Sequence, residues 1–138
     1  MALLIGLDLV LTDEVDDAIR AHGRRYLERV YSDSELRDCG DDARRLALRF
    51  AAKEATIKAL GVANGPALWR SIVVQQSSAG SSIALVGPAA VLARRARIES
   101  LALSLASRGS LACAIVIGQV DRSARRAHQD STAPTFRS

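Results

Sequence analysis

The amino-acid sequence predicts a single α+β domain in which an antiparallel-rich sheet packs against one long central helix. Residues 42–61 place apolar side chains at helical spacing and end at a glycine, which predicts the long helix. Residues 3–11 are apolar on both faces of an extended chain, which is typical of a buried strand. Residues 101–105 and 111–117 alternate large with small side chains on either side of a short turn, which predicts a hairpin.

Composition narrows the class of protein. The chain has 138 residues, of which 49% are hydrophobic and 25% charged, as in an ordinary globular domain. A net charge of +4 predicts an anionic partner, such as nucleic acid, a phosphorylated ligand or an acidic protein. Aromatic residues make up only 4% and do not interleave with the basic clusters, so we expect no nucleic-acid partner.

Targeting and metal signals are absent from the sequence pattern. No apolar run is long enough to span a bilayer, and residues 1–10 lack the features of a signal peptide, so we expect a cytoplasmic protein without membrane association. Cys39 lies in an expected polar loop and Cys113 in an apolar run, without the spacing of a metal site. We interpret Cys113 as a buried, inert thiol.

The first expected element is the strand at residues 3–11, which carries an acid. Asp8 follows two positions after Gly6, and the glycine leaves space beside the carboxylate. A buried carboxylate is costly unless it is hydrogen-bonded, paired with a cation or bound to a metal. Asp8 is therefore either a structural acid that accepts backbone hydrogen bonds or part of a functional site.

Helical segments come next along the chain. Thr12 is a suitable N-cap for a helix with acids in its first turn. Residues 24–30 either continue that helix or form a second short one. Residues 32–35 fit a capping box, which accounts for Glu35 without a catalytic role.

The central helix combines a charged pair with a stripe of small residues. Glu54 and Lys58 are four residues apart and share a helix face, and Ala51 and Ala47 continue their line. Small side chains let a helix lie close to its neighbour. Lys53 and Lys58 are the only lysines in the protein. The alternative interpretation is an ordinary amphipathic helix with a surface ion pair.

The segment after the central helix predicts a loop, a hairpin and a helix. Residues 61–68 contain several turn residues, with Gly61 as the natural residue after the helix C-terminus. Residues 69–76 and 81–86 read as two strands of a hairpin. A helix is expected to start at Gly87 and Pro88 and to run through Arg97, with Pro88 suited to the first turn.

The last hairpin is predicted to contact the central helix. Its strands each have a small face, made of Ala102, Ser104 and Ala106 on one strand and of Ala112 and Ala114 on the other. We expect both small faces to pack against the alanine stripe. The domain is expected to cover residues 1–120, and residues 121–138 to form a polar, basic tail without stable structure.

Asp8 and Glu54 form a candidate pair across two rigid elements. One is on a buried strand and the other on a helix expected to pack against the sheet, with Lys58 one turn further along. Two carboxylates with a cation nearby suit a Mg²⁺ ion that also binds a diphosphate.

Two motifs resemble those of a known family. Residues 5–10 (IGLDLV) and 49–61 (RFAAKEATIKALG) resemble the two signature motifs of the holo-[acyl-carrier-protein] synthases, the small class of 4′-phosphopantetheinyl transferases. Residues 26–32 and the final hairpin extend the resemblance, which covers about residues 4–118. It implies the single-domain fold of that class.

The resemblance implies a reaction and roles for the central residues. Phosphopantetheine would move from coenzyme A to a serine of an apo acyl carrier protein, releasing adenosine 3′,5′-bisphosphate. Asp8 and Glu54 match the family's Mg²⁺ ligands, and Lys58 matches the lysine near the phosphates. Glu54, directly or through a metal-bound water, could take the serine proton.

Further residues are assigned to substrate binding. Arg49, Lys53 and Gly61 belong to the second motif, and Arg49 is a candidate for a coenzyme A phosphate or else part of a surface salt bridge. Ser107 and Arg108 end the first strand of the final hairpin. The family has a histidine where this chain has Ser107. The resemblance implies that this histidine helps to hold coenzyme A or the catalytic geometry across the subunit interface, so here that role is either lost or passes to Arg108.

The resemblance also implies partners. The family docks an acidic carrier protein on a region that in this chain holds four arginines: Arg20, Arg24, Arg25 and Arg29. The alternative interpretation of these arginines is a solvated basic face. Glu14 stands near where many members have an arginine, so carrier choice can differ, and fatty-acid and polyketide carriers both stay open.

The chain resembles the class that forms homotrimers with active sites between subunits. The alternative function is a non-catalytic or weakly active relative that binds coenzyme A or a carrier protein.

Overall fold

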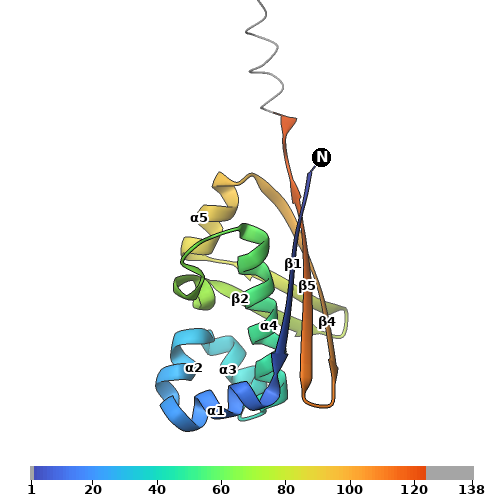
Figure 1. The fold of residues 1–138 in the computed structure, drawn as a ribbon. Coiled ribbons are helices and arrows are strands. Elements are labelled where there is room, and N and C mark those ends of the chain that lie inside the picture. The colour runs from blue at the N-terminus through green and yellow to red at the C-terminus, as the bar shows by residue number, and fades with distance from the viewer. Residues whose placement is uncertain (1, 124–138) are drawn as a thin grey trace, which may run out of the picture.

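The fold of this computed structural model, which describes residues 2–123, is α+β, as the sequence predicts (Figure 1). In chain order the elements are β1 Ala2–Leu11, α1 Thr12–His22, α2 Arg24–Val30, α3 Asp33–Cys39, α4 Ala43–Leu60, the 3-10 helix η1 Gly65–Ser71, β2 Ile72–Ser77, β3 Gly80–Leu85, α5 Gly87–Arg95, β4 Ile98–Arg108 and β5 Leu111–Val120. An antiparallel sheet has the order β1-β5-β4, and β2 pairs with β3 in a separate hairpin. The three-stranded sheet forms one layer, α4 lies along it, and the remaining helices gather on the other side of α4 (Figure 1).

The contact between α4 and β1 depends on a glycine. A Cβ added at Gly6 would lie 1.7 Å from the backbone oxygen of Ala55, so no other residue fits without moving the strand away from the helix. Ala51 and Ala55 are fully buried on the helix side. The prediction that small side chains let the central helix pack closely is confirmed here, and Gly6 is the strand's part of that contact.

The prediction for the final hairpin is half right. Ala112 and Ala114 of β5 are buried against α4, but Ala106 and its neighbours on the small face of β4 are exposed. The register explains the difference, because Leu105 pairs with Ala114 and paired residues of an antiparallel sheet share a face. The leucines of β4 therefore point to the core, and its small face points outward.

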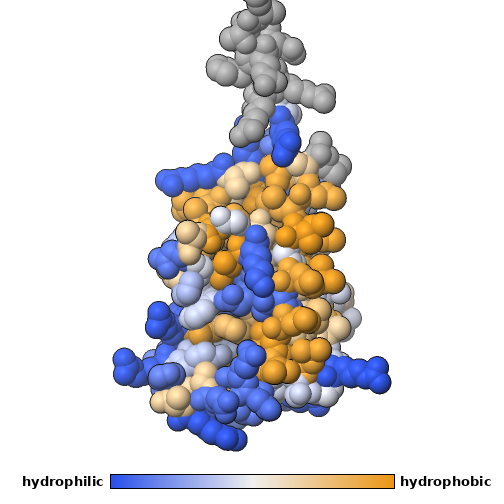
Figure 2. Space-filling model, in the orientation of Figure 1, coloured by the Kyte–Doolittle hydropathy of each residue, from blue (hydrophilic) through white to orange (hydrophobic). Residues whose placement is uncertain are grey.

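The outer face of β1 corrects the prediction of a strand buried on both sides. Five of its residues are between 45% and 66% exposed, namely Leu3, Ile5, Leu7, Leu9 and Leu11. Leu111, Ile115 and Ile117 of β5 extend the same face. Figure 2 shows these hydrophobic side chains gathered along the side of the molecule formed by the sheet. The prediction of alternating side chains was right, but no other element within residues 2–123 covers this side of the strand.

Several element ends differ from the sequence-based expectations. Trp69 belongs to η1 and β2 begins at Ile72, whereas the sequence predicted a strand from Trp69. Helix α5 ends at Arg95, and Arg97 has a positive φ of 59°, which a helix cannot accommodate. Cys39 is buried at the end of α3, and Cys113 is only partly buried. The capping box of Ser32 and Glu35 and the helix end at Gly61 are confirmed.

Most of the predicted tail, residues 124–138, lies outside the described residues. Within residues 2–123, no helix is both long and apolar enough to cross a membrane.

Candidate functional site

Asp8 and Lys58 form an ion pair where β1 contacts α4. Lys58 Nζ lies 2.6 Å from Asp8 Oδ1 and also donates to the backbone oxygen of Leu7 at 3.2 Å. Asp8 shares the inner face of β1 with Gly6, which brings its carboxylate beside the helix. The Asp8 side chain is 14% exposed and that of Lys58 is 55% exposed, so the pair is open to solvent on one side. A ligand can therefore reach both groups.

Glu54 lies one helical turn before Lys58 and shares its side of α4. It is partly buried, and its Oε1 accepts a hydrogen bond of 2.6 Å from Nε1 of Trp69. The Trp69 ring packs on Phe50, with centroids 5.6 Å apart. The sequence reasoning did not single out Trp69, because residues 15 positions apart show no spacing signal. Its being the chain's only tryptophan was the one available hint.

The carboxylates of Asp8 and Glu54 are hard oxygen donors, which Mg²⁺ prefers. Among the described residues there is no group of three or more metal-ligating side chains, so the protein itself offers at most this pair here. That donor set fits a Mg²⁺ ion, because this ion is commonly held by one or two carboxylates together with substrate phosphates and water. The Lys58 ammonium now partners Asp8 and would stand beside such an ion.

Lys53, assigned to substrate binding from the sequence, is fully buried instead. Its Nζ lies 2.7 Å from Oε1 of Glu35, which is also fully buried, and donates to the backbone oxygens of Trp69 and Ile72. Burial lowers the pKa of the Lys53 ammonium, and the Glu35 carboxylate opposes that shift. These contacts occupy all three ammonium hydrogens, so they indicate a structural role in place of substrate binding.

Arg49 is also inside the protein, with only 1% of its side chain exposed. Its Nη1 donates to Oε1 of Gln76 at 2.9 Å, and Nη2 lies 4.0 Å from Asp38 Oδ2. Among residues 2–123, its Nε finds no hydrogen-bond partner. The guanidinium thus ties α4 to β2 within the chain, and the structure does not bring it to the Asp8–Lys58 pair. A surface salt bridge, the alternative interpretation, does not describe a buried side chain either.

Gly61, Ser107 and Arg108 are exposed. Gly61 adopts a left-handed conformation and ends α4 through backbone bonds to Ile57 and Lys58, which accounts for a glycine there without a ligand. Ser107 and Arg108 end β4, which is separated from β1 by β5. Within one chain they therefore lie two strands away from Asp8.

The four arginines assigned to carrier docking are all exposed on α1 and α2. Arg24 pairs with Glu28 along α2, and Arg29 lies 6.0 Å from the centroid of the Trp69 ring. The structure thus brings one of these arginines close to the Glu54 side of α4 through Trp69.

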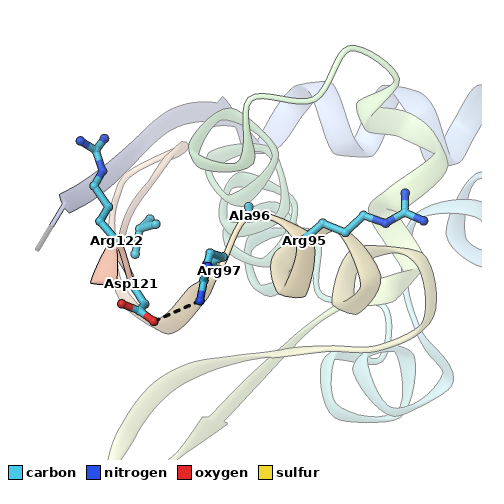
Figure 3. Close-up of a pocket in the computed structure, with 6 residues that line it drawn as sticks. Arg95, Ala96, Arg97, Asp121 and Arg122 are labelled. Carbon is cyan, nitrogen blue, oxygen red and sulfur yellow. Dashed lines mark ion pairs between the residues drawn. The ribbon is translucent and has the colours of Figure 1, made fainter. Parts of the chain in front are cut away.

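A second basic cluster lines a pocket where β4 begins and β5 ends (Figure 3). Arg97 pairs with Asp121 at 3.6 Å, while Arg95 and Arg122 point away from that pair and from each other (Figure 3). Divergent arginines do not converge on one anion, so we do not include this pocket in the candidate site.

Fold and site together define a class of small α+β enzyme with a carboxylate and an ammonium at a strand–helix contact. A family model of the 4′-phosphopantetheinyl transferase superfamily matches residues 4–116. The chain belongs to the holo-[acyl-carrier-protein] synthase family of that superfamily, as its relatives establish.

The relatives cover nearly all of the described fold. A holo-[acyl-carrier-protein] synthase of Herpetosiphon aurantiacus is 37% identical over 124 residues, covering 84% of this chain and 98% of the relative. One of Anaeromyxobacter dehalogenans is 39% identical over 123 residues, covering 85% and 95%. The crystal structure of the Helicobacter pylori enzyme in complex with coenzyme A is 28% identical, has a TM-score of 0.74, and is covered over its whole length by 84% of this chain.

Proposed function

We propose that this enzyme transfers the 4′-phosphopantetheine group of coenzyme A to a serine of an apo acyl carrier protein, with Mg²⁺, and releases adenosine 3′,5′-bisphosphate. The observation that carries the proposal is the solvent-open Asp8–Lys58 pair, with Glu54 one turn away on the same side of α4. The relatives add support, since they are synthases of the holo carrier protein and one was solved with coenzyme A.

Asp8 and Glu54 are the residues that would hold the Mg²⁺ ion. When bound, the ion would neutralise charge on the diphosphate oxygens and align the reacting phosphorus. Gly6 supports this arrangement, because only a residue without a side chain lets β1 bring Asp8 this close to α4.

Lys58 and Glu54 have separate roles in the transfer. The serine oxygen forms a bond to the β-phosphorus of coenzyme A, and the bond from that phosphorus to the oxygen of the adenosine bisphosphate breaks. Lys58 stabilises the negative charge that develops on the leaving phosphate. Glu54 accepts the serine proton, and its oxygen not engaged by Trp69 is free for that task.

An acidic carrier protein is the proposed partner of α1 and α2. Arg20, Arg24, Arg25 and Arg29 are exposed there, and basic side chains attract an acidic surface and orient it on approach. Arg29 lies nearest to the site, through its contact with Trp69. The carrier serine would then arrive beside Glu54.

We further propose a homotrimer with active sites between subunits. The outer face of β1 and β5 exposes a continuous apolar surface, which marks an interaction site on a protein of this size. Ser107 and Arg108 lie two strands from Asp8 within one chain, and an interface along the sheet would let them contribute to the site of a neighbouring copy. Sedimentation should give the mass of three chains, and a monomer would contradict the assembly.

The test is modification of an apo carrier protein, read by intact mass. With coenzyme A and Mg²⁺, the carrier should gain the mass of one phosphopantetheine group. No gain on either a fatty-acid or a polyketide carrier would favour the alternative, a non-catalytic relative that binds coenzyme A or a carrier. Ser107, in the place of the family's histidine, is the sequence feature that keeps this alternative open.

Two variants test the assignment of the carboxylates. Asp8→Ala and Glu54→Ala should each abolish Mg²⁺-dependent turnover and leave the circular dichroism of the fold unchanged. Asp41→Ala is the matched control, because Asp41 is an exposed carboxylate in the turn before α4. Retained turnover in either of the first two variants would refute the metal assignment.

A further inference from the structure

Trp69 forms a hydrogen bond with the proposed catalytic carboxylate, that of Glu54, from a different element of the fold. It lies in η1, and its indole Nε1 donates to Oε1 of Glu54 at 2.6 Å. A hydrogen bond to an ionised carboxylate is shorter and roughly twice as strong as one between neutral groups. Because this bond occupies one carboxylate oxygen, it also decides which oxygen stays free.

The indole ring is itself held on two sides. Phe50, one turn before Glu54 on α4, packs against it with an interplanar angle of 59°. The guanidinium of Arg29 lies 6.0 Å from the ring centroid. A ring held in this way has little freedom to rotate, so its N–H points at Glu54 in a fixed direction.

The backbone around Trp69 is equally constrained. Its carbonyl oxygen accepts a hydrogen bond of 2.7 Å from the buried Lys53. The next residue, Arg70, donates to the backbone oxygen of Glu28 and pairs with Asp33 at 3.4 Å. Thus η1 is attached to α4 on one side and to α2 and α3 on the other.

We propose that Trp69 is a positioning residue for Glu54, which it holds so that one carboxylate oxygen faces the cation and the incoming serine hydroxyl. This inference rests on the proposed function. The residue acts through Glu54 and does not itself touch the reacting atoms. Hydrogen-bond partners of a metal-binding side chain typically contribute about tenfold to a hundredfold in metal affinity or activity.

A structural role for the same side chain predicts a different outcome. If Trp69 only fills space between η1 and α4, its shape matters and its N–H does not. Replacing the N–H by a sulfur atom keeps the bicyclic shape and removes the donor. Since Trp69 is the only tryptophan, a tryptophan-requiring expression strain can carry out this replacement at one position in the full chain.

The experiment compares two tryptophan analogues in the full-length protein. Benzothienylalanine removes the N–H donor, and 5-fluorotryptophan is the matched control that keeps it. We measure kcat and KM for apo carrier modification, the binding of Mn²⁺ by electron paramagnetic resonance, and unfolding in urea. Mn²⁺ is used as the probe because it prefers the same oxygen ligands as Mg²⁺.

The expected result is a selective loss in the benzothienylalanine protein. Its kcat should fall about tenfold to a hundredfold and its Mn²⁺ binding should weaken, while KM for the carrier stays unchanged and the urea midpoint shows a protein that is still fully folded under assay conditions. The fluorotryptophan protein should match the normal one in all four measurements. Trp69→Phe, which also loses the donor, should show the same fall in kcat.

Two outcomes would overturn the proposal. One is a benzothienylalanine protein with normal kcat and normal Mn²⁺ binding. The other is an equal loss with both analogues, because the loss would then follow from the ring and not from the N–H. If the unmodified protein itself transfers no phosphopantetheine, the proposed function fails, and the Mn²⁺ measurement still decides whether Trp69 positions Glu54.

Discussion

Helix α4 carries two lysine–carboxylate pairs that differ in almost everything except distance. Lys53 lies 2.7 Å from Glu35 and Lys58 lies 2.6 Å from Asp8. Both members of the first pair are fully buried, whereas Lys58 is 55% exposed. A short ion pair therefore does not reveal a functional site. Solvent access and free hydrogen-bonding capacity separate the structural pair from the one that can receive a ligand.

The buried pair is fully used by the fold. Glu35 accepts hydrogen bonds from the backbone of Ser32 and of Val74 as well as from Lys53. One carboxylate thereby caps α3 and ties it to α4 and β2. By contrast, within the described part of the chain Lys58 donates only to Asp8 and Leu7, both on β1, so the open pair connects one helix to one strand.

The largest expected effect is on stability and comes from breaking the buried pair. Lys53→Met leaves the Glu35 carboxylate buried without its cation, which should lower the free energy of unfolding by about 3–5 kcal/mol. Lys58→Met is the matched control, because its pair with Asp8 is open to solvent on one side and the same change there should cost clearly less. Urea unfolding of both variants measures the difference. Equal losses would mean that burial does not distinguish the pairs.

The control variant, Lys58→Met, should lose activity although it loses little stability. Lys58→Met removes the cation proposed to act on the leaving phosphate, so its carrier modification should fall although its stability is nearly normal. A stable and fully active Lys58→Met protein would remove the open pair from the proposed site.

The second prediction tests whether the open pair depends on the approach of β1 to α4. Gly6→Ala places a Cβ against the backbone oxygen of Ala55, so strand and helix must separate, at a cost of about 3 kcal/mol. Separation also moves Asp8 away from Glu54, so turnover should fall. Thermal unfolding and the carrier assay measure the two effects.

A glycine on β5 provides the control for this substitution. A Cβ at Gly118 would first meet the end of the Leu101 side chain, at 3.1 Å, and that side chain can move. Gly118→Ala should therefore cost less stability and leave turnover normal. If Gly6→Ala behaves like Gly118→Ala, the close approach is not required.

Sequence reasoning singled out both members of the open pair, although it did not predict that Asp8 and Lys58 contact each other. Asp8, Glu54 and Lys58 were singled out because a motif and a four-residue spacing marked them, and their roles stay a proposal. Lys53 was misassigned because its partner, Glu35, lies 18 residues earlier, and no local pattern shows that a lysine will be buried with a distant acid. Glu35 was explained as a cap, which is correct but incomplete.

The sheet shows a second limit of pattern-based prediction. An apolar strand such as residues 2–11 predicts that both faces are covered, but it does not say what covers them. In β4 the alternation was evident, yet which face points inward follows from the pairing of Leu105 with Ala114, and the register is a property of the folded hairpin.

The smallest predicted effect is a pH dependence of stability that comes from Tyr31, which lies next to the buried Lys53–Glu35 pair. Tyr31 lies beside Lys53, with its ring centroid 5.8 Å from Nζ, and donates to the backbone oxygen of Leu46. Burial raises the pKa of the Tyr31 hydroxyl above its ordinary value of 10.0, and the nearby Tyr26 adds to this shift. The folded protein therefore keeps a proton that the unfolded chain loses above about pH 10.

The sign follows from this difference in bound protons. Below pH 10 both states hold the Tyr31 proton, so its contribution to stability is constant. Above pH 10 the unfolded state holds fewer protons, and this contribution falls by up to about 1.4 kcal/mol per pH unit. The lowered pKa of Lys53 acts in the opposite direction, because the unfolded chain holds that proton up to pH 10.5 and stability rises with pH until then.

Comparison with Tyr31→Phe isolates the Tyr31 hydroxyl together with its hydrogen bond to Tyr26, because Lys53 is present in both proteins. The difference in unfolding free energy between the normal protein and this variant should be constant from pH 8 to about pH 9.5 and should shrink above about pH 10. Urea unfolding across that range measures it. A constant difference up to pH 11 would contradict this prediction, because it would show that the Tyr31 hydroxyl ionises equally in the folded and unfolded states. We expect unequal ionisation because Tyr31 is fully buried beside the Lys53–Glu35 pair, which is itself fully buried.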